Sequence, residues 1–131
     1  MRYKIRLSYD GSAFCGWQIQ PKDRTVQGDL EKALQTLTGV QIQVTGAGRT
    51  DTEVNAINYI AHFELPDEVR IEAAQLCYKL NAILPRELAV HEVSVTEDEF
   101  HARFDARSRE YHYFIHFTKD PFCEKFSYRM R

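Results

Sequence analysis

Apolar and polar residues alternate in five stretches of the chain, and each alternation predicts a β-strand. The first stretch, YKIRLSY (3–9), places four apolar side chains on one face and Lys4, Arg6 and Ser8 on the other. We therefore expect a half-buried strand with a basic outer face. The other four stretches are VQIQV (40–44), INYIAHFEL (57–65), LAVHEVSV (88–95) and REYHYFIHF (109–117).

Two further stretches have the apolar spacing of amphipathic helices. Thr25 can cap the first helix, which Gly39 stops. The pair Pro66–Asp67 is expected to open the second helix, and Pro85 ends it. The resulting order is β-α-β-β-α-β plus an extra strand, which is the split β-α-β pattern of ferredoxin-like folds. We predict an α+β fold in which two helices pack on one antiparallel sheet.

Composition indicates a single cytoplasmic domain. With 131 residues, of which 44% are hydrophobic, the chain is long enough to bury one core. We expect no membrane-spanning helix, because no run of about 18 apolar residues occurs, and the charged N-terminus lacks a signal-peptide core. Cys15, Cys77 and Cys123 are odd in number and widely spaced, which fits neither a disulfide framework nor a zinc site.

Charge is distributed unevenly along the chain. The net charge is −2, but residues 1–50 carry seven Lys and Arg against four Asp and Glu, and residues 101–131 carry the same numbers. Residues 51–100 carry three against eleven. Two basic ends around an acidic middle allow nucleic-acid binding by one face but do not require it, and the acidic middle is more typical of a solvated helix surface.

The segment GAGRTDTEVNA (46–56) places an arginine and an aspartate two positions apart among glycines. In an extended chain, Arg49 and Asp51 would point the same way. An arginine a few ångströms from a carboxylate keeps it ionised, as a nucleophile or general base requires. Gly46 and Gly48 would let a flat substrate approach the backbone. The same spacing also fits a structural ion pair beside a turn, so it leaves both interpretations open.

The last predicted strand carries tyrosines and histidines. Tyr111 and Tyr113 alternate with polar residues, as core aromatics do, although a tyrosine at the wet end of a strand can also stack on a base. The five histidines lack metal-ligand spacing. His112 and His116 would lie roughly 13 Å apart on one face, at about 3.3 Å per residue. We therefore expect no metal site.

The sequence GAGRTD resembles the catalytic motif of the TruA family of tRNA pseudouridine synthases, whose pattern is close to G-A-G-R-T-D-A-G-V-H-A. Three further segments are similar to that family and occur in the expected order. They are YDGSAFCGWQIQPKDRTVQGDLEKAL (9–34), LNAILP (80–85) and FHARFDARSREYHYFI (100–115). Because the matches extend over nearly the whole chain, the resemblance is specific.

The resemblance implies conversion of uridine to pseudouridine in the anticodon arm of tRNA, without a cofactor. Asp51 matches the catalytic aspartate, which attacks the target nucleotide or promotes glycosidic cleavage. Arg49 matches the arginine that pairs with this aspartate near the flipped nucleotide, and Tyr111 matches the tyrosine that packs on the base. These roles are chemically compatible, since base flipping exposes the glycosidic bond to a charged carboxylate.

Basic residues outside the motif are candidates for phosphate contacts, which give affinity and position but no sequence readout. The candidates are Lys4, Arg6, Lys22, Arg24, Arg103, Arg107 and Arg109. In the loop before the first helix, Trp17 and Phe14 fit either an RNA-facing position or a buried loop anchor.

Two positions after Asp51 depart from the family pattern. Glu53 replaces a glycine, which adds a negative charge beside Asp51 and places a side chain where the backbone favours glycine. Asn55 replaces a histidine and keeps only its hydrogen-bonding capacity. Both departures bear on the efficiency of catalysis.

Members of the family carry a second, similar half that completes the cleft and forms dimer contacts. We therefore expect residues 1–131 to be the N-terminal ferredoxin-like domain of a two-domain, homodimeric enzyme, with little activity alone. Two alternatives stay open. One is a non-catalytic RNA-binding module of the same fold, and the other is a self-associating structural domain without an RNA partner.

Overall fold

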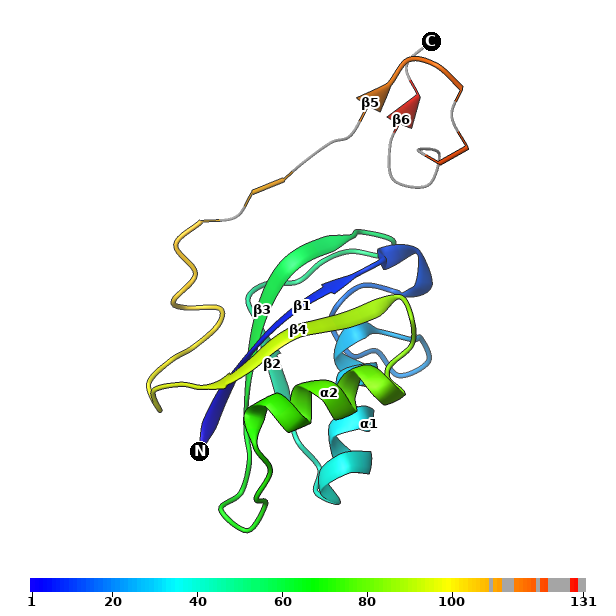
Figure 1. The fold of residues 1–131 in the computed structure, drawn as a ribbon. Coiled ribbons are helices and arrows are strands. Elements are labelled where there is room, and N and C mark those ends of the chain that lie inside the picture. The colour runs from blue at the N-terminus through cyan, green and yellow to red at the C-terminus, as the bar shows by residue number, and fades with distance from the viewer. Residues whose placement is uncertain (109, 112–114, 120, 123–127, 130–131) are drawn as a thin grey trace.

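A four-stranded antiparallel sheet forms the centre of the computed structural model, which describes residues 1–108, 110–111, 115–119, 121–122 and 128–129. Its strands are β1 (Arg2–Tyr9), β2 (Val44–Gly46), β3 (Ala56–Glu64) and β4 (Leu88–Val95), and its helices are α1 (Val26–Thr38) and α2 (Ala73–Ile83). The strand order is β2-β3-β1-β4, with each helix connecting two strands (Figure 1). The predicted β-α-β-β-α-β fold is confirmed.

Alternation along β1 separates the helix-covered face of the sheet from its open face. Tyr3, Ile5, Leu7 and Tyr9 are buried and share one core cluster with the buried apolar residues of both helices. The residues between them are only half-buried and lie on the other face. The predicted half-buried strand with a basic outer face is therefore correct.

The ends of α1 agree with the sequence signals. The Thr25 hydroxyl accepts a hydrogen bond from the Gly28 N–H at 3.2 Å, and Gly39 follows the helix with a φ of 75°. A side-chain cap and a left-handed glycine satisfy backbone groups that the helix leaves unpaired at its two ends. The short 3₁₀ helix η1 (Gly11–Ala13) precedes α1.

Two predicted boundaries, the start of the second helix and the start of the second strand, are wrong. Residues 66–72 form a loop instead of the first turns of a helix, with the Val69 N–H bonded to the Pro66 carbonyl at 2.9 Å. Its apolar residues Val69 and Ile71 pack against the core without helical structure. Likewise, residues 40–43 are not a strand, and pairing begins at Val44.

The extra strand predicted over residues 109–117 does not join the central sheet within the described residues. Its described part, β5 (Ile115–His116), pairs in parallel with β6 (Tyr128–Arg129) in a separate two-stranded sheet. The predictions for Arg109, His112, Tyr113 and Cys123 lie outside the described residues. Neither described helix has the length and apolar character that crossing a membrane requires.

Candidate active site

Arg49 and Asp51 lie in the loop between β2 and β3, beyond the end of β2 at Gly46. Both side chains are exposed, and no ion pair within 4.0 Å joins them. The expected pairing of Arg49 with Asp51 is therefore not formed in this structure. The expectation assumed an extended strand, in which residues two apart share a face, whereas the backbone here belongs to a loop.

Thr50, between these two residues, points toward the sheet and anchors the loop. Its Oγ1 atom lies 2.8 Å from the Tyr9 hydroxyl, and its carbonyl accepts a hydrogen bond from the Trp17 N–H at 3.3 Å. The side chain of Asp51, in contrast, forms no hydrogen bond or ion pair with any residue that the structure describes. The loop thus presents at its surface a carboxylate that has no partner in the described part of the chain, while the backbone beside it is anchored through Thr50.

Four aromatic rings lie beneath this loop. The ring centres of Tyr9 and Tyr59 are 5.9 Å apart, and those of Trp17 and Tyr59 are 4.6 Å apart. Trp17 and Phe14 are only 4% and 3% exposed, so they are loop anchors and do not face RNA in this structure. Burial raises the pKa of Tyr9 above its ordinary value, and the hydrogen bond with Thr50 opposes this rise.

The phenol groups of the two strand tyrosines hold the loop at two points. Besides the contact of Tyr9 with Thr50, the Tyr59 hydroxyl donates to the Gly48 carbonyl and accepts from the Gly48 N–H at 3.1 Å. Both tyrosines belong to stretches whose alternation predicted strands, and that alternation gave no indication of these contacts. The signal was the residue type, because a buried tyrosine, unlike phenylalanine, brings a hydroxyl that needs a partner.

The loop of residues 11–16 approaches the backbone of the Asp51 loop closely, and this explains its glycines. Gly16 has a φ of +81°, and a Cβ atom at this position would overlap the Thr50 carbonyl oxygen. A Cβ atom on Gly11 would overlap the carbonyl of Val54. Residues 11–16 can therefore pack directly against the segment that carries Asp51 only because these positions lack side chains.

The two departures from the family pattern have different consequences in the structure. Glu53 has a φ of 69°, in the left-handed region that favours glycine, so the expectation about its backbone is confirmed. The Oδ1 atom of Asn55 accepts a hydrogen bond from the Gly11 N–H at 2.7 Å. Asn55 therefore joins the two loops through the hydrogen-bonding capacity that the sequence predicted for it.

Tyr111 is not brought to Asp51 in this structure. Its side chain is 72% exposed and forms no ring contact or hydrogen bond with any described residue. None of the described residues of the strand expected over 109–117 pairs with the central sheet. Its contact with a base stays a prediction.

The predicted phosphate-binding residues differ in their surroundings. Arg6 donates to the Oδ1 atom of Asn58 at 2.9 Å, and Arg24 forms an ion pair with Asp29 at 3.0 Å. Another group has exposed cationic side chains without an ion pair or hydrogen bond to the described part of the chain. This group consists of Lys22, Arg103 and Arg107.

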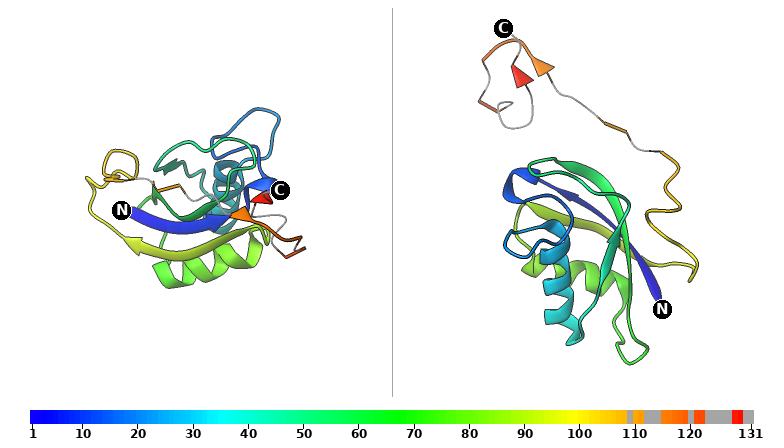
Figure 2. Two further views of the ribbon diagram at one scale, coloured as in Figure 1. Left: turned by 90° about the horizontal axis from the view of Figure 1, so that it is seen from above. Right: turned by 180° about the vertical axis from the view of Figure 1, so that it is seen from behind.

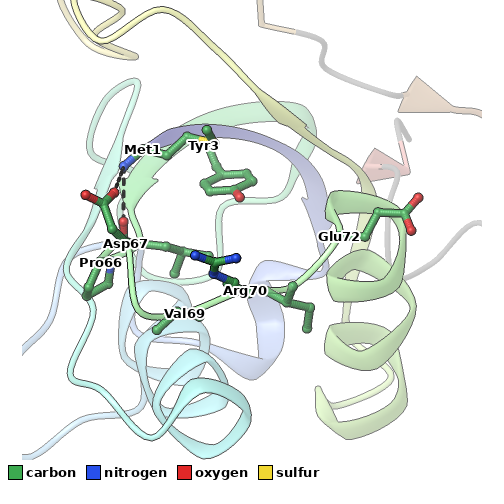
Figure 3. A pocket seen from close by; sticks show the side chains of 9 residues that line it. Met1, Tyr3, Pro66, Asp67, Val69, Arg70 and Glu72 are labelled. Carbon is green, nitrogen blue, oxygen red and sulfur yellow. Dashed lines mark hydrogen bonds and ion pairs between the residues drawn. The ribbon is translucent and has the colours of Figure 1, made fainter.

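The described residues also contain a pocket of about 510 Å³ at the far end of β1 from the loop (Figure 3). Tyr3 and Arg70 line it, whereas Tyr9 contacts the Asp51 loop at the other end of the strand. No candidate catalytic residue lines this pocket. Within the described part of the chain, no three His, Cys, Asp or Glu side chains are grouped to hold a metal ion.

Comparison with known proteins gives consistent matches. A family model described as tRNA pseudouridine synthase matches residues 6–105. The tRNA pseudouridine synthase A of Porphyromonas gingivalis is 43% identical over 123 residues, which cover 94% of this chain and 49% of that protein. The protein of the same name from Bacillus subtilis is 44% identical over 138 residues, covering 99% of this chain and 55% of the relative. The chain thus spans about half the length of the curated relatives it matches.

Proposed function

Because the chain belongs to the tRNA pseudouridine synthase family, we propose that the protein containing it converts uridine to pseudouridine in tRNA, with Asp51 as the catalytic residue. The observation that carries this proposal is the exposed Asp51 side chain, which has no partner among the described residues, next to the anchored Thr50. A carboxylate held at a fixed position without a competing internal partner is suited to act on a bound nucleotide.

The proposed reaction is an isomerisation at one nucleotide. The carboxylate of Asp51 attacks the sugar, or promotes cleavage of its bond to the base, so that the C1′–N1 bond breaks with its electron pair on N1. The uracil turns, and a new bond forms between C1′ and C5; where the carboxylate has bonded to the sugar, its C–O bond to C1′ breaks in this step and the electron pair returns to Asp51. The C5 proton then leaves and N1 gains a proton, so the atoms balance without a cofactor. Base flipping, as in other enzymes that act on nucleotides within a stack, gives the carboxylate access to this bond.

Arg49 and Tyr111 complete the proposed site when RNA binds. Arg49 is exposed and has no ion pair with a described residue, which leaves its guanidinium available for the backbone of the flipped nucleotide. Tyr111 is exposed as well, and stacking on the uracil would bury its ring. We place the target uridines in the anticodon arm, as the resemblance to the family implies.

The activity belongs, in this proposal, to a longer homodimeric protein. The chain spans about half the length of its relatives. In this proposal it supplies Asp51 and Tyr111, and the other half of the protein supplies the rest of the site. Residues 1–131 alone should therefore bind tRNA weakly and form little pseudouridine.

A chimera tests this function directly. Residues 1–131 replace the matching half of the Bacillus subtilis relative, to which they are 44% identical. The relative supplies the second half. Loss of the C5 proton is followed as tritium release from tRNA that contains [5-³H]uridine, and the modified positions are mapped. Tritium release with pseudouridine in the anticodon arm supports the proposal. A folded chimera that binds tRNA and releases no tritium supports the alternative of a non-catalytic RNA-binding module, which Glu53 beside Asp51 favours.

A further inference from the structure

Residues 100–105, which we call the strap, pack against the open face of the sheet at Arg2, Lys4 and His62. The chain reaches this face beside the N-terminal end of β1, where the Thr96 N–H donates to the Arg2 carbonyl at 2.9 Å (Figure 2). The Arg2 guanidinium then donates to the Phe100 carbonyl at 2.5 Å. Within the strap, the Asp105 carboxylate accepts from the His101 N–H at 2.7 Å. The strap is thus a closed turn that begins the path toward Tyr111.

His62 of β3 lies beneath this strap and is only 5% exposed. Its Nδ1 atom accepts a hydrogen bond from the N–H of Ala102 at 3.0 Å, and Ala102 is itself 3% exposed. The rings of Phe100 and His101 pack edge-on against the imidazole, with ring centres 6.1 and 4.7 Å away. The His62 side chain therefore contacts the strap in two ways, by ring packing and by a buried hydrogen bond.

The hydrogen bond requires a neutral imidazole with its proton on Nε2, because Nδ1 accepts. Protonation would turn Nδ1 into a donor that faces the Ala102 N–H, and the bond would be lost. Neighbouring charges come from both strands and from the strap. The facing groups are Arg2 and Lys4 on β1, Glu64 on β3, and His101 and Asp105 in the strap. Burial in the first place, and then the Arg2 charge, lower the pKa of His62 below its ordinary value of 6.5.

We propose that His62 is a positioning residue, whose Nδ1 atom fixes the strap on the sheet and thereby sets where the chain that leads to Tyr111 leaves the domain. The effect on Tyr111 rests on the proposed function. The contact of His62 with the strap is independent of the proposed function, because it follows from the geometry of residues 62 and 100–105 alone.

Two substitutions separate the acceptor atom from the ring. His62→Asn keeps an acceptor at the δ position and cannot titrate, whereas His62→Phe keeps an aromatic ring and removes the acceptor. Hydrogen exchange of the Ala102 amide is measured by NMR in the 131-residue chain, as protection factors from about pH 5 to about pH 8. In the unmodified chain, protection should fall at least about tenfold as the pH decreases through the pKa of His62. His62→Asn should stay protected throughout, and His62→Phe should be unprotected at every pH.

Equal protection of Ala102 in all three proteins would overturn the proposal, as would identical behaviour of the two variants. If His62→Phe does not fold, the protonation of the His62 ring in the unmodified chain provides the test. Its nitrogen chemical shifts at neutral pH should show the proton on Nε2, and a proton on Nδ1 would overturn the proposal.

The link to Tyr111 is tested in the chimera. His62→Phe should lower tritium release about tenfold, and His62→Asn should restore it. Unchanged release in His62→Phe would overturn the link to Tyr111. Should the unmodified chimera be inactive, the proposed function fails, while the exchange measurement still decides the role of His62.

Discussion

The Tyr9 hydroxyl and the Thr50 hydroxyl lie 2.8 Å apart, so that the end of β1 is bonded to the centre of the Arg49-Thr50-Asp51 sequence. This contact turns the middle residue toward the aromatic cluster, while Arg49 and Asp51 stay exposed. A partly buried polar contact beneath an exposed carboxylate allows the fold to position Asp51 without using its side chain as a structural partner.

Removing this contact should loosen the loop and leave the sheet intact. Tyr9→Phe should lower the free energy of unfolding by about 1 kcal/mol, the typical net value of one hydrogen bond. Urea unfolding of this variant, of Thr50→Val and of the double variant forms a mutant cycle. We expect the two losses to be less than additive. Strict additivity would show that the hydroxyl groups do not depend on each other.

Glu53 should lower stability through its backbone conformation. An L-residue in the left-handed region costs about 1–2 kcal/mol, and part of this is offset by the greater freedom of glycine in the unfolded chain. Glu53→Gly should therefore raise the free energy of unfolding by about 0.5–1 kcal/mol.

Glu53→Gln is the matched control, because it removes the charge and keeps the strained backbone. It should leave stability nearly unchanged but, like Glu53→Gly, strengthen tRNA binding by removing a negative charge beside Asp51. Equal stabilisation by the two substitutions would contradict the backbone explanation.

Among the predicted phosphate-binding residues, Lys22, Arg103 and Arg107 should contribute most to tRNA binding. Each phosphate contact changes the slope of log affinity against log salt by about 0.7–0.9. Replacement of Lys22, Arg103 and Arg107 by alanine should therefore reduce the magnitude of this slope by about 2. Arg24→Ala should have a smaller effect, since Asp29 already neutralises this side chain. A slope unchanged in the triple variant would exclude these residues from the RNA interface.

Stability should decrease on the acidic side of neutrality because of His62. Its pKa is lower in the folded protein than the ordinary value of 6.5, so the unfolded chain takes up a proton first as the pH falls. The contribution of the neutral ring is complete above about pH 6.5 and is lost as the pH decreases through the folded-state pKa. Thermal unfolding across this range should show a shallower decrease for His62→Asn. An identical pH dependence would assign the decrease to other groups.

Capping residues and apolar alternation in the sequence correctly predicted the helix and strand ends that neighbouring residues determine. Thr25 and Gly39 specify the ends of α1, and the alternation in residues 88–95 matches the bounds of β4. The same kind of signal failed at residues 66–72, where Val69 and Ile71 pack against the core without helical structure. A proline at position 66 starts a loop rather than a helix.

The candidate site was predictable in its residues but not in its arrangement. Arg49 and Asp51 were found from a motif, yet their relative placement follows from the Tyr9–Thr50 contact across 41 residues of sequence. Spacing rules for strands do not apply to a loop that a distant tyrosine holds in place.

The most direct test of the account is the rate of tritium release from [5-³H]uridine-labelled tRNA by the chimera with Asp51→Asn. This substitution keeps the size of the side chain and removes its charge. Asp67→Asn is the matched control, because Asp67 is fully exposed and follows the other end of β3 from the Asp51 loop. We predict that Asp51→Asn lowers release at least about 10³-fold with nearly unchanged tRNA affinity, whereas Asp67→Asn keeps the original rate. Release at the original rate by the Asp51→Asn protein would contradict the account.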